Sequence, residues 1–322
     1  MNRVTWLNLG GAALALALSI GMSTRAVRDR SGGVTDRAAA LTPTHELTDA
    51  TYHTVKLREF SRIASASALA DPLLLALCEP GRVIAFSDYS TQKLPSSYLY
   101  SGKQTIRRLE DVESILALKP DLVLINDFGA PAFVSRLRAS GVEVFDLGEM
   151  RGLKSLFANI QTVATLVGHP ERGEALKRSL KRRLRRLGYA NLPAGTPRRQ
   201  AIYLSSYGAR LFGGTTGTSY HDLLEHGGLE DAAAERYANW PEYSKEQVLA
   251  LAPEVIVTRS GEADRLCQIA GFDKLPACRT RHVIEIPIEL LDDPGPLLID
   301  AAELVFEKTQ PIILSPSKDE KR

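Results

Sequence analysis

Histidine and acid pairs are the first side chains to examine for chemistry, and their spacing argues against a metal site. His221 and His226 are five residues apart, about 140° around a helix, so they do not share a face. His221 and Glu225 are four apart and can share one, but a zinc site needs a third protein ligand that the sequence does not offer nearby. We therefore expect no metal-ligating residues.

Other catalytic patterns are missing as well. The segment 213–219 has neither G-x-G-x-x-G spacing nor a Walker lysine, and no G-x-S-x-G occurs anywhere in the chain. Cys78 follows an apolar run without an accompanying His motif, which indicates a buried hydrophobic side chain. With no nucleophile or acid–base pair standing out, we predict a protein that is not an enzyme and has no cofactor. An exported α/β enzyme is the alternative.

Two segments of similar sequence indicate two similar α/β lobes. Residues 113–125 read E-S-I-L-A-L-K-P-D-L-V-L-I and residues 246–258 read E-Q-V-L-A-L-A-P-E-V-I-V-T, at an offset of 246 − 113 = 133 residues without a gap. Each copy predicts a short helix, a Pro-acid turn and a buried parallel strand. Because proline disfavours helix at the residue before it, Lys119 and Ala252 should end their helices.

The elements around each copy repeat in order. Strands are predicted at 62–67, 83–86, 122–125 and 142–145, and again at 200–206, 255–257 and 282–286, with helices at 69–77, 132–139 and 220–226. This alternation predicts two Rossmann-like α/β lobes with mostly parallel sheets, at 48–152 and 189–310. The segment 153–188 between them is predicted to be helical, with Pro170 starting a long rigid inter-lobe helix.

The inter-lobe helix carries a run of basic side chains. A nucleic-acid or membrane-surface patch is one interpretation and a solvated helix face is the other. The formal net charge of the whole chain is only +2, so we expect a solvated face and no nucleic-acid partner. The residues are Lys177, Arg178, Lys181, Arg182, Arg183, Arg185 and Arg186.

The first 26 residues predict a signal peptide. An uncharged Ala/Leu-rich stretch at 7–22 follows a weakly basic start, and Thr24-Arg25-Ala26 resembles an A-x-A cleavage site. An uncleaved anchor is the alternative, and no lipoprotein cysteine lies near the cut. Residues 27–47 and 311–322 are predicted to be disordered. Export would favour a disulfide between Cys267 and Cys278.

Five segments together resemble the periplasmic substrate-binding proteins of ABC importers for cobalamin, haem and iron-siderophores. They cover 62–77, 83–89, 109–125, 218–231 and 243–257, and include R-I-A-S-A-S-A-L-A-D-P-L-L-L-A-L, T-S-Y-H-D-L-L-E-H-G-G-L-E-D and Y-S-K-E-Q-V-L-A-L-A-P-E-V-I-V. No segment is diagnostic by itself, but their order and spacing are specific. The resemblance implies two lobes joined by one long helix and a location in the periplasm.

The function implied by the resemblance is a monomeric receptor without catalysis. It would capture a metal chelate or corrinoid between its lobes and deliver it to a membrane permease whose ATPase is a different chain. A ligand-binding module used for sensing without a transporter is a third possibility. Related receptors dock through one surface acid per lobe. Glu225 matches the second-lobe position, whereas the first-lobe position near Lys93 has no acid and leaves Asp88 as a weak substitute.

Candidate ligand-binding residues follow from the rule that open α/β sheets bind ligands beyond the carboxyl ends of their strands. Aromatic rings among them suit a flat or macrocyclic ligand, and arginines suit its carboxylates. Tyr98 or Tyr100 is also a candidate iron ligand for haem. The predicted set is Ser67, Asp88, Tyr89, Tyr98, Tyr100, Asp127, Phe128, Tyr207, Arg210, Trp240, Tyr243 and Arg259.

Overall fold

The computed structural model describes residues 45–93, 95–108, 111–126, 131–291 and 295–314. Residues 1–44 lie outside these ranges, so the predicted signal peptide and most of the predicted lead-in are outside the described residues. In the described part of the chain, no helix is both long and apolar enough to cross a membrane.

The first lobe contains a five-stranded sheet in which every pairing is parallel. Its four inner and C-terminal strands were predicted from the sequence, and the edge strand β5 was not. Helix α2 (Ala70–Leu77) covers one face, and helices α3 (Val112–Ala117) and α4 (Pro131–Ala139) cover the other. Side chains alternate between these faces because strand residues point to opposite sides in turn. The strand order is β5 (Gln104–Ile106), β4 (Val83–Ser87), β3 (Ile63–Ser65), β6 (Leu122–Ile125) and β7 (Glu143–Asp146).

The second lobe has a mixed sheet. Strands β8 (Gln200–Tyr207), β12 (Val255–Arg259) and β13 (Val283–Ile286) are parallel, and the short β10 (Glu230–Asp231) joins β8. Strands β9 (Arg210–Gly214) and β11 (Glu242–Tyr243) are antiparallel and extend the sheet beyond β8; like β10, they were not predicted from the sequence.

Two glycines explain why β9 escaped prediction. Gly213 and Gly214 suggest a loop, but here the rings of Tyr243 and Tyr220 occupy the space that a Cβ atom would need. Glycine therefore serves close packing in β9 rather than a turn. The α-helices described for the second lobe are α7 (Ser219–His226), α8 (Lys245–Leu251), α9 (Ala263–Cys267), α10 (Pro276–Thr280), α11 (Ile288–Leu291) and α12 (Leu297–Ile313). Helix α12 continues through Pro311, three residues beyond the predicted end of the lobe at 310.

The repeated sequence has the same structural role in both lobes. The acid after its proline accepts hydrogen bonds from the backbone at the start of a central strand, just before β3 in the first lobe and at the first residue of β8 in the second. Asp121 accepts from the amides of Ser61 (2.7 Å) and Arg62 (2.9 Å), and Glu254 accepts from the amide of Gln200 (3.0 Å). The preceding residues, Lys119 and Ala252, both adopt positive φ values, 51° and 42°. Helices α3 and α8 have ended by these positions, as predicted.

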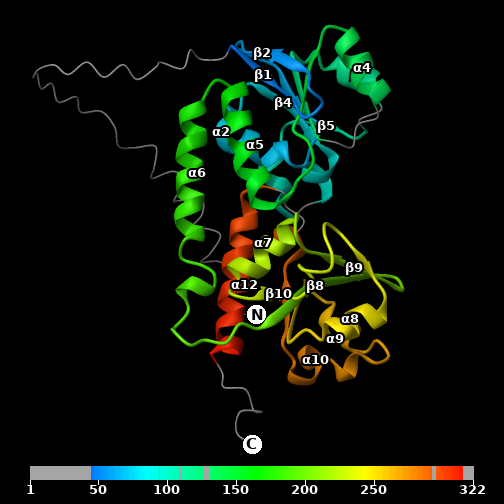
Figure 1. Ribbon diagram of the computed structural model, residues 1–322. Coiled ribbons are helices and arrows are strands. Elements are labelled where there is room, and N and C mark those ends of the chain that lie inside the picture. The colour runs from blue at the N-terminus through cyan, green and yellow to red at the C-terminus, as the bar shows by residue number, and fades with distance from the viewer. Residues whose placement is uncertain (1–44, 94, 109–110, 127–130, 292–294, 315–322) are drawn as a thin grey trace, which may run out of the picture. The chain divides into compact units, whose positions relative to one another are not determined.

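Two antiparallel helices join the lobes. Helix α5 (Gly152–Leu166) leads into α6 (Pro170–Leu184) through a turn at Gly168, whose φ is 83°. Gly173 on α6 lies against Ala164 on α5, so the two helices pack closely. The predicted inter-lobe helix corresponds to α6, a helix of 15 residues that begins at Pro170 as predicted. Figure 1 shows α6 running beside α5 and toward α12.

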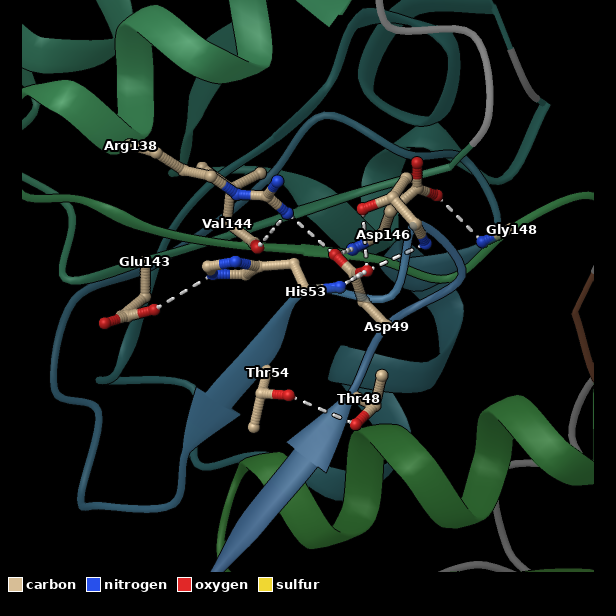
Figure 2. A network of polar contacts seen from close by, with 10 residues as sticks. Thr48, Asp49, His53, Thr54, Arg138, Glu143, Val144, Asp146 and Gly148 are labelled. Atoms are coloured by element: carbon tan, nitrogen blue, oxygen red, sulfur yellow. Dashed lines mark hydrogen bonds and ion pairs between the residues drawn. The ribbon is translucent and has the colours of Figure 1, made fainter.

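A small hairpin of β1 (Glu46–Thr48) and β2 (Thr54–Lys56) is added to the first lobe. Its turn is organised by Asp49, whose enclosed carboxylate accepts from the amide of His53 and from Arg138 Nη2 at 2.7 Å (Figure 2). Glu46 and Leu47 were predicted to be disordered. They are ordered here because these contacts fix the hairpin to β7 and α4.

Candidate functional site

The carboxyl end of the first sheet gathers part of the predicted ligand site. Asp88 and Tyr89 follow β4 directly and are half-buried. A π-helical turn, Tyr89–Lys93, and a short 3-10 helix, Pro95–Tyr100, then lead to β5. On the second of these, the side chain of Tyr98 is 63% exposed and is therefore accessible to a ligand.

Two predicted residues of the first lobe face the core instead. Ser67 is buried, and its hydroxyl accepts hydrogen bonds from the amides of Leu69 and Ala70 at the start of α2. Tyr100 is 4% exposed and packs edge to face on Phe86, with ring centroids 4.9 Å apart. In this conformation neither side chain offers surface to a ligand. Of the two candidate iron ligands, only Tyr98 is accessible.

In the second lobe, an exposed strip runs across the strands that the sequence did not predict. Tyr207 ends β8 and is 78% exposed, and it pairs with Arg210 at the start of β9. Arg210 forms a two-pronged ion pair with Glu242 on β11. Trp240 is 43% exposed and lies two residues before Glu242. Tyr207, Arg210 and Glu242 lie on the three neighbouring strands β8, β9 and β11, and Trp240 lies in the segment that leads into β11. Arg210 would have to exchange Glu242 for a ligand carboxylate.

Tyr243 and Arg259 complete the predicted set of the second lobe. Tyr243 is 4% exposed, and its ring packs on Gly213 and edge to face on Tyr237 at 5.1 Å. Burial raises the pKa of its phenol, so it is a core residue. Arg259 ends β12 and is half-buried. Asp127 and Phe128 lie outside the described residues.

The structure shows a cavity of about 380 Å³ elsewhere on the first lobe, beside β5 and α3. None of the predicted ligand-binding residues lines it. Its walls are Gln104, Thr105, Ile106, Arg107, Arg108, Asp111, Ser114, Ile115 and Leu118. Asp111 is already used there, since its carboxylate accepts from Ser114 as the cap of α3.

Three acids and an arginine near the predicted site were not found from the sequence. Asp71 is buried in α2 and hydrogen-bonds Ser87 at the end of β4. Glu262 accepts from the amide of Ser206, beside Tyr207, at 3.1 Å. Arg151, paired with Glu149, donates to Asn239 beside Trp240 at 3.1 Å. A signal for Asp71 was present, because it is the one charged residue in the apolar run A-D-P-L-L-L-A-L.

His221 on α7 has an acidic partner within the protein. His221 Nδ1 lies 2.8 Å from Asp231 Oδ2, and this hydrogen bond, opposed by burial, raises the pKa of the imidazole. Over the ranges that the structure describes, no group of three or more His, Cys, Asp or Glu side chains could hold a metal ion. Cys267 and Cys278 are placed as a disulfide pair with their Cα atoms 5.5 Å apart.

A comparison with protein families identifies the family of this chain. Residues 63–290 match the model of a family described as periplasmic binding protein. The chain belongs to this family. The relatives are binding proteins rather than enzymes.

Individual relatives agree with that assignment. The chain is 25% identical to a vitamin B12-binding protein of Pectobacterium atrosepticum, over 73% of this chain and 82% of the relative. It is 23% identical to the ABC transporter substrate-binding lipoprotein YvrC of Bacillus subtilis, over 62% of this chain and 65% of the relative, just under two thirds of its length.

Solved structures show the same fold. The vitamin B12-binding protein BtuF of Vibrio cholerae aligns with a TM-score of 0.64 at 23% identity, covering 80% of this chain and 99% of that one. The haem-binding protein HutB of Vibrio cholerae aligns with a TM-score of 0.67 at 19% identity, covering 79% and 99%. The two-lobed α/β architecture predicted from the sequence is therefore confirmed.

Proposed function

We propose that the chain is the periplasmic receptor of an ABC importer and that it captures a metal chelate or corrinoid, with cobalamin, haem and a ferric siderophore as the candidate ligands. The exposed strip of Tyr207, Arg210 and Trp240 carries the proposal. Large rings at a surface bind flat ligands well because they bury much area at small entropic cost. The vitamin B12-binding and haem-binding proteins among the relatives support this ligand class.

The test is a titration of the purified protein with cyanocobalamin, haemin and a ferric siderophore, followed by tryptophan fluorescence. Tyr207→Ala should weaken binding of the preferred probe about tenfold, as expected for the loss of a buried ring. Tyr52→Ala is the matched control, because Tyr52 is 90% exposed on the β1–β2 hairpin. Equal affinities of the two variants would show that Tyr207 is not part of the binding site. Failure of all three probes to bind would contradict the proposed ligand class.

Delivery to a permease is proposed to involve Glu225. Its side chain lies on α7 and is half-exposed, so it can meet an arginine on a partner. Glu225→Arg should slow uptake of the ligand by cells while its affinity for the purified protein stays unchanged. Unchanged uptake would show that Glu225 has no docking role.

Export to the periplasm is proposed from the predicted signal peptide at 1–26, with the Cys267–Cys278 disulfide formed there and the receptor acting as a monomer. A loop this short would stabilise the fold by about 2–3 kcal/mol in the chain-entropy model. The intact mass of the protein from the periplasm tests the export and the disulfide. Cleavage removes the mass of residues 1–26, and the disulfide lowers the mass by two hydrogens relative to the reduced chain. An unprocessed or fully reduced mass would contradict them.

A further inference from the structure

Asp71 lies on α2 beneath the turn that carries two predicted ligand-binding residues. We propose that Asp71 is the positioning residue of this turn: its carboxylate holds residues 87–93 in the shape that presents Asp88 and Tyr89 to the ligand. The inference rests on the proposed function, because that function is what gives Asp88 and Tyr89 a ligand to meet.

A chain of hydrogen bonds leads from Asp71 into the turn. Asp71 is 0% exposed, and its Oδ2 accepts from both the amide (3.2 Å) and the hydroxyl (2.5 Å) of Ser87. The Ser87 hydroxyl accepts in turn from the amide of Ser90 at 3.4 Å, and Thr91 Oγ1 donates to the Ser87 carbonyl at 2.9 Å. Asp88 and Tyr89 lie between Ser87 and Ser90, so the segment that contains them is held at both ends.

Asp49 shows what a buried acid with a structural role looks like in the same lobe. Its side chain is also enclosed, but its carboxylate is paired with Arg138 and both of its oxygens accept hydrogen bonds (Figure 2). Asp71 forms no ion pair among the described residues, and its two hydrogen bonds of good geometry, both on Oδ2, come from Ser87. Burying a carboxyl group in this way costs free energy. Fold stability alone therefore does not explain an acid at position 71.

The environment of Asp71 also makes its charge sensitive to pH. Burial raises its pKa to about 6, although the hydroxyls of Ser65, Ser87 and Ser90 act in the opposite direction. The pKa of Asp71 is thus set by burial and by neutral hydrogen-bond donors rather than by a charged side chain. Lys154 on α5 is exposed, Asp88 beyond β4 is half-buried, and Glu79 pairs with Arg82 beyond the far end of α2.

The sign of the effect follows from the raised pKa. Between the ordinary value of 3.8 and about 6, the folded protein binds a proton at Asp71 that the unfolded chain does not. The contribution of this group to stability is therefore greatest at acid pH and is lost as the pH rises through 6. A protonated Asp71 accepts hydrogen bonds less well, so its hold on Ser87 should weaken as the pH falls.

The experiment compares Asp71→Asn with Asp49→Asn, which makes the same change in an enclosed acid remote from the turn. In the ligand-free protein, Asp71→Asn should speed amide hydrogen exchange at 87–93, whereas Asp49→Asn should speed it only around 49–54. Asp71→Asn should also weaken cyanocobalamin or haemin binding about tenfold, as expected when a hydrogen bond to a charged group is lost. Ser87→Ala should act in the same direction, and it replaces Asp71→Asn if that variant does not fold.

A pH series separates positioning from general stability. From about pH 7.5 to about pH 5, the wild type and Asp49→Asn should lose affinity for the bound probe, while Asp71→Asn should not follow that loss. If Asp71→Asn leaves exchange at 87–93 unchanged, or keeps the wild-type pH dependence, the positioning role is wrong. If the wild type binds neither probe, the proposed ligand class fails, and the exchange data still decide the role of Asp71.

Discussion

Ala252 has a strained backbone conformation that the sequence alone does not predict. Ala252 adopts φ 42° and ψ 52° as the C-cap of α8, a left-handed conformation that costs about 1 kcal/mol or more for residues other than glycine. The sequence predicted the end of the helix correctly from Pro253. It could not predict the backbone angle, because proline restricts the preceding residue without selecting a left-handed one.

Relief of that strain is measurable. Ala252→Gly should raise the free energy of unfolding by about 0.5–1 kcal/mol, because glycine enters the left-handed region without a steric penalty. Ala250→Gly is the control, since Ala250 is an exposed residue of the same helix and should lose about 1 kcal/mol. Urea unfolding of both variants provides the comparison. A loss of stability in Ala252→Gly would mean that the strain is outweighed by the freedom of glycine in the unfolded chain.

The elements of the fold were more predictable than the site. Parallel strands are buried on both faces and so read as apolar runs, and β6 was predicted at its observed bounds, Leu122–Ile125. Strands β9 and β11 were missed, and with them the fact that Tyr207, Arg210 and Glu242 lie on neighbouring strands, with Trp240 two residues before β11. The sequence also did not predict which aromatic side chains are buried. Tyr98 and Tyr100 are two residues apart on one short helix, yet Tyr98 is exposed and Tyr100 is in the core.

The Pro-acid turn is the element-level feature with the clearest test. Asp121→Ala leaves the amides of Ser61 and Arg62 without their acceptor and should cost about 1–2 kcal/mol. Burial raises the pKa of Asp121, but these hydrogen bonds outweigh it and the net pKa is lowered. Its stabilising effect is thus present above pH 3.8 and lost as the pH falls below it. In urea unfolding, the free energies of unfolding of the wild type and Asp121→Ala should differ at neutral pH and become equal at acid pH. A constant difference would contradict the ionised role.

At the scale of the two lobes, the two sheets share one hydrophobic core. Side chains from both lobes and from α5, α6, α7 and α12 form a single cluster. Polar contacts add to it at both ends of α6. Arg172 reaches Glu79 of the first lobe at 2.9 Å, and Arg183 binds Asp300 and Glu303 on α12. A closely packed core resists continuous deformation, so we expect the lobes to move little when ligand binds.

Small-angle scattering tests this rigidity. With cyanocobalamin or haemin bound, the radius of gyration should change by less than about 1 Å, as for pre-organised complexes. Arg183→Met removes the link between α6 and α12 and should lower stability by about 1–3 kcal/mol while increasing the change on binding. Arg182→Met is the control, because Arg182 is exposed on the same helix and should behave like the wild type. A large closure in the wild type would show that the shared core does not limit the lobes, and that the ligand is enclosed by hinge motion instead.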